Sequence, residues 1–200
     1  MTHMSTKQLN EESSEVGQNL FYGISVKRNY RKAFPYLLEA ARSGDIHPQN
    51  LVGYCYDLGL GVKKDKAQAL FWYKQAAKYD HKEALFNLAL FYERGDGVAP
   101  NPRKAFSLYK RAAELGDPGA QCNLAVAYLD GVGVKQNLAK GIEWMRKAAR
   151  KGDAKAQYNL GMAYLAGEGL KMNRLRARGW LKKAAEQGHK KALSALRRAS

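Results

Sequence analysis

Long apolar segments are missing from this chain of 200 residues. No run approaches the roughly 18 apolar residues that a membrane-spanning helix needs, so we expect no membrane insertion. The first 14 residues are almost all polar and lack the apolar core of a signal peptide. We therefore favour a cytoplasmic location, although removal of an export signal would leave the same sequence. Residues 1–9 are expected to be a flexible N-terminus that includes a tag remnant.

Residues with the spacing of a catalytic or metal site are also scarce. The only cysteines, Cys55 and Cys122, stand far apart and suit a reducing compartment as small apolar residues. No two histidines have the i, i+4 spacing of a helical metal site, and His81 and His189 are expected to lie at the surface or cap helices. The glycine-rich stretches lack the Gly-Lys-Ser/Thr of a phosphate loop. We predict no cofactor, no metal, no catalytic residues and no enzymatic activity.

Acidic residues are few, because 34 Lys and Arg face 18 Asp and Glu, giving a net charge of +16. The excess is concentrated in residues 118–200, which hold 17 basic and 5 acidic residues. Weak polyanion binding through this basic C-terminal third is one interpretation, and a solvated helix face is the other. The basic cluster comprises Lys171, Arg174, Arg176, Arg178, Lys182, Lys183, Lys190, Lys191, Arg197 and Arg198.

What the sequence has in abundance is a repeat without insertions. Tyrosines recur every 36 residues at Tyr56, Tyr92, Tyr128 and Tyr164, and glycines do so at Gly61, Gly97, Gly133 and Gly169. Pairs of alanines beginning at Ala40 recur with the same period to Ala184. A fixed period of this length indicates stacked supersecondary units that bury their apolar faces only against one another. We place the repeats at 10–45, 46–81, 82–117, 118–153 and 154–189, followed by a tail at 190–200.

Each repeat has the pattern of two helices, as residues 82–117 illustrate. Apolar residues with helical spacing precede Gly95, and glycine readily ends a helix in the left-handed conformation. Asn101 then provides a helix N-cap, Pro102 suits the first helical position, and Gly116 ends the second helix. Asp65, Asn137 and Asn173 repeat this cap. Alanines should let the helix axes approach, at Ala84, Ala89, Ala105 and Ala112.

The period predicts ten main helices, a short eleventh at 190–198 and no sheet. Gly97, Gly133 and Gly169 are expected to have positive φ, because they stand at one place in the loop of successive repeats. Two departures are local: Asp80 replaces the glycine that ends other repeats, and Pro48 stands where the next repeat has Ala84.

Two stretches carry a resemblance to a known family. One runs from Ala120-Gln121-Cys122-Asn123-Leu124-Ala125 through Tyr128 and Gly131-Val132-Gly133-Val134 to Trp144 and Lys147-Ala148-Ala149. The other repeats it from Ala156-Gln157-Tyr158-Asn159-Leu160-Gly161 to Trp180. Both resemble the Sel-1-like repeat, a relative of the tetratricopeptide repeat. The resemblance implies an all-α fold, an α/α right-handed superhelical solenoid of five helix-pair repeats plus a C-terminal capping helix, that serves as an interaction scaffold or adaptor.

Matching positions to this motif predicts an inner face formed by the first helix of each repeat. We expect it to bind a partner protein or peptide; the alternative function is a basic surface that binds nucleic acid or other polyanions. The apolar positions could instead be plain helix packing, and the asparagines could bond a ligand or tie one repeat to the next. The predicted partner-binding residues are Asn50, Tyr54, Phe86, Asn87, Leu90, Cys122, Asn123, Val126, Tyr158, Asn159 and Met162.

Overall fold

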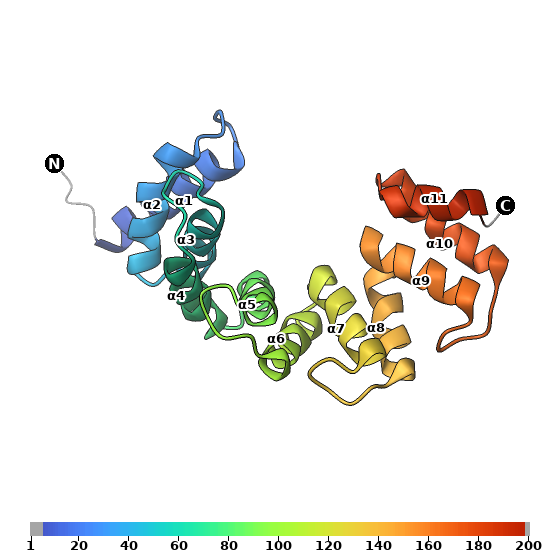
Figure 1. Cartoon of the computed structure of the whole chain (residues 1–200). Coiled ribbons are helices and arrows are strands. Elements are labelled where there is room, and N and C mark those ends of the chain that lie inside the picture. Colours follow the sequence, from blue (N-terminus) through green and yellow to red (C-terminus); the bar gives the residue numbers. More distant parts are fainter. Residues whose placement is uncertain (1–5, 199–200) are drawn as a thin grey trace. The chain divides into compact units, whose positions relative to one another are not determined.

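The computed structural model describes residues 6–198 and contains eleven α-helices over that range, with no strand (Figure 1). None of the helices described is long and apolar enough to cross a membrane. Helix α1 begins at Thr6, within the stretch expected to be flexible, and residues 1–5, 199 and 200 lie outside the described residues. The helices are α1 Thr6–Tyr22, α2 Tyr30–Arg42, α3 Ile46–Leu58, α4 Lys66–Ala77, α5 Lys82–Arg94, α6 Pro102–Glu114, α7 Pro118–Asp130, α8 Leu138–Arg150, α9 Ala154–Ala166, α10 Arg174–Glu186 and α11 Lys190–Arg198.

The chain forms two compact units, which we call the N-terminal unit (residues 1–100) and the C-terminal unit (residues 101–200). The N-terminal unit contains α1 to α5 and the C-terminal unit contains α6 to α11. In both units the dominant helix contacts join helices that are consecutive in the chain, as Figure 1 shows for α1 and α2 or α9 and α10. The predicted all-α fold, with a short C-terminal helix after five helix pairs, is confirmed.

Helix boundaries follow from the predicted caps. The second helix of each repeat begins after an Asn or Asp whose side chain accepts a hydrogen bond from a backbone N–H in the first turn, which satisfies a donor that has no partner within the helix. These caps are Asn29, Asp65, Asn101, Asn137 and Asn173. The first helix of most repeats is capped in the same way, by Asp45, His81, Asp117 and Asp153. His81 is therefore a capping residue, as the sequence predicts.

The two departures from the repeat keep its backbone geometry. Asp80 has a φ of 56°, the left-handed conformation that glycine adopts at the same place in other repeats. Pro48 is buried in the first turn of α3, where a backbone N–H has no partner within the helix, so its missing donor costs little.

Alanines fill the closest contacts between helices. Ala84, Ala89 and Ala112 are 0% exposed and Ala105 is 4% exposed, which confirms their predicted place in the core. Larger side chains fill the wider gaps. In the N-terminal unit Phe21, Leu37 and Trp72 belong to one cluster, and in the C-terminal unit Met145, Leu160 and Tyr164 belong to another.

Buried glutamines join the first helix of a repeat to the helix before it. Three of them stand at one position of the repeat, and each side-chain amide donates a second hydrogen bond to a carbonyl near the end of the preceding helix, which also accepts the N–H of the glycine that follows that helix. The pairs are Gln49 with Ala41 at 3.2 Å, Gln121 with Ala113 at 3.0 Å and Gln157 with Ala149 at 3.2 Å. Successive repeats are thus linked by hydrogen bonds as well as by apolar packing.

The loop glycines also lie against the preceding repeat. Gly97, Gly133 and Gly169 have φ values of 67°, 73° and 68°, as predicted. A Cβ atom on Gly133 would lie 2.2 Å from the carbonyl oxygen of Pro102 at the start of α6. At Gly97 the nearest atoms, on Lys66, would be 3.4 Å away, which is ordinary contact. The loop of the fourth repeat therefore packs more tightly than that of the third.

We expect Gly133→Ala to lower the free energy of unfolding by about 2–4 kcal/mol, because the strain of a positive φ adds to a backbone clash. Gly152→Ala is the matched control in the same unit. Gly152 also has a positive φ, of 93°, but a Cβ atom there would meet nothing within 4 Å beyond its own chain neighbours. It should cost only about 1–2 kcal/mol. Urea unfolding followed by circular dichroism measures both, and equal losses would contradict the clash.

Candidate functional site

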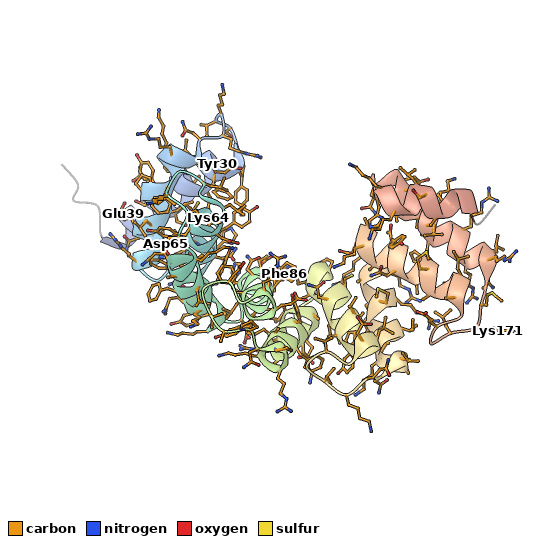
Figure 2. The ribbon with its side chains drawn as sticks, viewed as in Figure 1. Tyr30, Glu39, Lys64, Asp65, Phe86 and Lys171 are labelled. Carbon is orange, nitrogen blue, oxygen red and sulfur yellow. The ribbon has the colours of Figure 1, made fainter. Side chains whose placement is uncertain are left out.

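In the N-terminal unit, the predicted inner residues lie on α3 and α5. Tyr54 on α3 is 38% exposed, and its ring packs edge-on against Phe21 with centroids 6.2 Å apart. Phe86 and Leu90 on α5 are half-buried, and Figure 2 shows Phe86 on that helix. Asn50 is only 6% exposed, so it contributes little surface to a partner. Tyr54, Phe86 and Leu90 remain as the larger side chains that reach solvent here.

In the C-terminal unit, the predicted residues separate into core and surface. Met162 on α9 is 37% exposed, while Val126 on α7 is half-buried and packs against the core. The prediction for Cys122 is wrong: it is 1% exposed and belongs to the core cluster with Ala156 and Leu160. Its side chain is shorter than Tyr158 at the same repeat position, and neighbouring residues cover it.

The asparagines of the inner face form hydrogen bonds within the chain. The amide of Asn87 donates to the side-chain oxygen of Asn50 at 3.4 Å, which ties the third repeat to the second. Farther along, Lys155 donates to the side-chain oxygen of Asn123 at 3.5 Å, which ties the fifth repeat to the fourth. These bonds favour the interpretation that asparagines connect repeats. Asn159 instead lines a hollow beside Tyr158.

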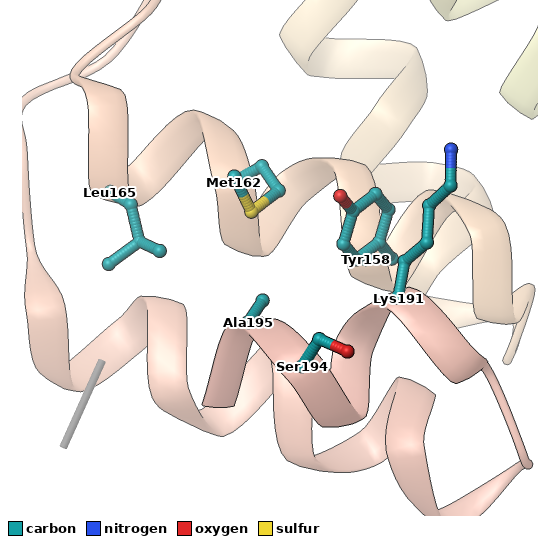
Figure 3. A pocket seen from close by; sticks show the side chains of 6 residues that line it. All are labelled: Tyr158, Met162, Leu165, Lys191, Ser194 and Ala195. Atoms are coloured by element: carbon teal, nitrogen blue, oxygen red, sulfur yellow. The ribbon is translucent and has the colours of Figure 1, made fainter. Parts of the chain in front are cut away.

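Tyr158 lines two hollows between α9 and α11. The first has a volume of about 250 Å³ and lies where Tyr158, Met162 and Leu165 of α9 face Lys191, Ser194 and Ala195 of α11, as Figure 3 shows. Most of its lining side chains are apolar or aromatic, namely Tyr158, Met162, Leu165 and Ala195. We call it the apolar hollow.

The second hollow, which we call the basic hollow, shares Tyr158 and Lys191 with the first. It is lined by Lys155, Tyr158, Asn159, His189, Lys190 and Lys191. The ring of His189 stacks on Tyr158 with centroids 4.6 Å apart, and its Nδ1 accepts a hydrogen bond from the backbone N–H of Ala192. Lys155, His189 and Ser194 are not among the partner-binding residues predicted from the sequence, although the period places Lys155 and Lys191 at one repeat position.

A chain of hydrogen bonds that no sequence pattern indicates links three repeats of the N-terminal unit. The Nε2 of His47 lies 3.0 Å from the Tyr22 hydroxyl, and its Nδ1 lies 3.1 Å from Nε2 of His81. The Nδ1 of His81 accepts a hydrogen bond from the backbone N–H of Ala84. This arrangement requires a neutral His81 with its hydrogen on Nε2, which donates to His47.

The electrostatic surroundings of His81 favour that neutral form. Burial lowers the pKa of its imidazole, and His47 and Lys82 act in the same direction, while Glu83 opposes them. A proton on Nδ1 would remove the acceptor of the Ala84 N–H and would face the Glu83 carboxylate oxygen, which is 3.4 Å from Nδ1. We therefore expect the cap of α5 to weaken in acid.

The cysteines are poorly suited to nucleophilic chemistry. Burial raises the pKa of the Cys55 and Cys122 thiols to about 12, so the reactive thiolate is scarce at neutral pH. Among the described residues, no group of three or more His, Cys, Asp and Glu side chains has the arrangement of a metal site.

Comparison with known families gives a match over most of the chain. The profile described as Sel1 repeat matches residues 14–45, 49–81, 82–117, 118–153 and 154–189. A comparison with curated proteins gave no match.

Solved structures share the fold. A Sel1 repeat protein from Oxalobacter formigenes is 29% identical with a TM-score of 0.87, and the match covers 96% of this chain and 78% of that protein. The protective antigen c5321 of uropathogenic Escherichia coli, which displays an SLR fold, is 30% identical with a TM-score of 0.83. That match covers 94% of this chain but only 40% of c5321. The immunity protein Pa5087 from Pseudomonas aeruginosa is similar in fold alone, at 20% identity and a TM-score of 0.60 over 96% of this chain and 70% of that protein.

The histidine chain predicts that the stability of the N-terminal unit depends on pH. Because folding favours neutral His81, its contribution is present above the ordinary imidazole pKa of 6.5 and is lost as the pH falls below it. Loss of an N-cap costs about 1 kcal/mol. His81→Asn keeps a capping oxygen that does not titrate. Between about pH 7.5 and about pH 5, we expect urea unfolding to show a smaller loss of stability in this variant than in the unaltered protein. Equal losses would contradict the role of His81.

Proposed function

This chain belongs to the Sel1 repeat family, whose members are generally protein-interaction scaffolds, and we propose that it holds a segment of a partner protein against the first helices of its repeats. The observation that carries the proposal is the pair of hollows around Tyr158, which open between α9 and α11. Large apolar side chains that reach solvent beside a hollow are typical of protein-binding surfaces.

The C-terminal unit offers the better-formed part of this surface. Met162 and Tyr158 are one helical turn apart on α9, and both line the apolar hollow. A side chain of a bound segment could fill this hollow, and the segment could then continue along α7 past Val126. In many interfaces a few anchor residues of this kind contribute most of the binding free energy.

Phe86 and Tyr158 are the proposed hot spots, with an expected loss of about 2 kcal/mol in binding on truncation to alanine. Tyr158 has a second role that affects this experiment. It packs against the cluster formed by Leu181, Ala184, Ala192 and Ala195, so its truncation should also loosen α11. Substitutions at Met162 give a cleaner measurement of binding, since more of its side chain is exposed.

We propose a scaffold without catalytic activity. The family is generally non-enzymatic, and both thiols are protonated at neutral pH. Polyanion binding is the weaker candidate, because many cations of the C-terminal unit have intramolecular partners. Arg146 and Arg176 contact the Tyr164 hydroxyl, and the Lys183 ammonium lies 4.7 Å from the centre of the Trp180 ring.

Selection of peptides from a random displayed library tests the proposal. Peptides selected on the unaltered protein should bind Met162→Asp at least about tenfold more weakly, because a carboxylate then occupies the rim of the apolar hollow. Leu175→Asp is the matched control. Leu175 is 83% exposed on α10, outside both hollows, and its replacement should leave the affinity unchanged.

Fluorescence anisotropy measures the affinities, and circular dichroism shows whether both variants retain their helix content. Equal weakening by both substitutions, or none by either, would place the peptides elsewhere and contradict the proposal.

A further inference from the structure

One position of the repeat changes its charge along the chain. This position is acidic in two repeats, with Glu11 in the first and Glu83 in the third. It is basic farther along, with Lys155 in the fifth repeat and Lys191 at the start of α11. The fold therefore accepts a charge of either sign at this position. The charged residues at this position of the C-terminal unit, Lys155 and Lys191, are thus both basic. Lys190 adds a third ammonium group to the hollow that they line.

The three lysines have no acidic partner among the described residues. Among the residues that the structure describes, none of the three forms an ion pair, and Lys155 donates a hydrogen bond to the amide oxygen of Asn123 at 3.5 Å. The nearest carboxylate along α9, that of Asp153, is engaged as the helix cap and accepts the Ala156 N–H at 2.6 Å. Three ammonium groups thus line one hollow without neutralisation, which favours an anionic ligand.

The basic hollow does not stand alone, since it shares Tyr158 and Lys191 with the apolar hollow. A ligand that fills both needs negative charge next to one apolar group. A peptide provides this combination when an aliphatic residue has acidic neighbours, because side chains of neighbouring residues point in different directions.

We propose that the Tyr158 site of the C-terminal unit binds an acidic peptide segment, with one aliphatic side chain in the apolar hollow and adjacent carboxylates on Lys155, Lys190 and Lys191. This rests on the proposed function and specifies the chemistry of its partner. The inferred ligand is a protein segment rather than a nucleic acid. Proteins that bind single-stranded nucleic acid stack successive bases on several aromatic side chains. This site has one tyrosine, and the ring of His189 already stacks on it.

The probe is a short fluorescein-labelled peptide with a central leucine flanked by glutamates, measured by anisotropy at roughly 0.15 M salt. We expect the unaltered protein to bind it, and the double variant Lys155→Glu and Lys191→Glu to bind at least about tenfold more weakly. The matched control is Lys171→Glu with Arg178→Glu. Both of these residues are exposed and lie outside the hollows. The two double variants change the net charge of the protein by the same amount. The control should alter the affinity less than about twofold.

Changes to the probe test the apolar half. Replacing its leucine by serine should weaken binding at least about fivefold, and replacing its glutamates by lysines should abolish binding. Equal loss in the two double variants would overturn the proposal, since it would indicate non-specific attraction. A short thymidine oligonucleotide that competes with the probe and binds more tightly would also overturn it.

The selected library separates this proposal from the proposed function. Peptides that depend on Met162 but are not enriched in Asp and Glu would overturn the acidic ligand and leave the scaffold intact. If the selected peptides do not depend on Met162 while the probe binds through Lys155 and Lys191, the proposed function is overturned and the acidic ligand is supported.

Discussion

Neighbouring helices pack over alanines whose methyl groups are wholly buried, such as Ala84 at the start of α5 and Ala148 near the end of α8. A larger side chain at such a place would push the helix axes apart, and the cost of overpacking a dense core is about 1–3 kcal/mol. The spacing of helices, the approach of the loops to the preceding repeat and the reach of the glutamine amides all depend on this contact. The constraint recurs in every repeat, which explains a period without insertions.

The sequence was sufficient to predict nearly all of the fold. The helix caps and the glycines of positive φ follow from local chemistry, and a residue such as Asn101 or Gly133 performs its task regardless of distant parts of the chain. Local chemistry also explains why the departures at Asp80 and Pro48 left the backbone geometry unchanged. Asp80 adopts a left-handed backbone conformation, and Pro48 lies in the first turn of its helix.

The candidate site was harder to predict because it depends on which side chains cover one another. Periodicity assigns Cys122 and Tyr158 to one position, but a short side chain there ends in the core and a long one reaches the surface. The bond between His47 and His81 joins residues 34 apart, and no local pattern distinguishes it from two separate surface histidines. Lys190 and Lys191 belong to the basic cluster seen in the sequence and Lys155 does not, and only the packing of α11 against Tyr158 of α9 shows that the three share a site.

The restriction of the dominant contacts to consecutive helices has a mechanical consequence. Because the dominant contacts of the described helices are between neighbours, a chain held at both ends and pulled should lose its repeats one after another. Each 36-residue repeat would release roughly 120–130 Å of extended chain, at about 3.3–3.6 Å per residue. Such a protein should unfold gradually under force. It can refold repeat by repeat when the force is removed, because each detached helix pair can pack again on the folded repeat beside it.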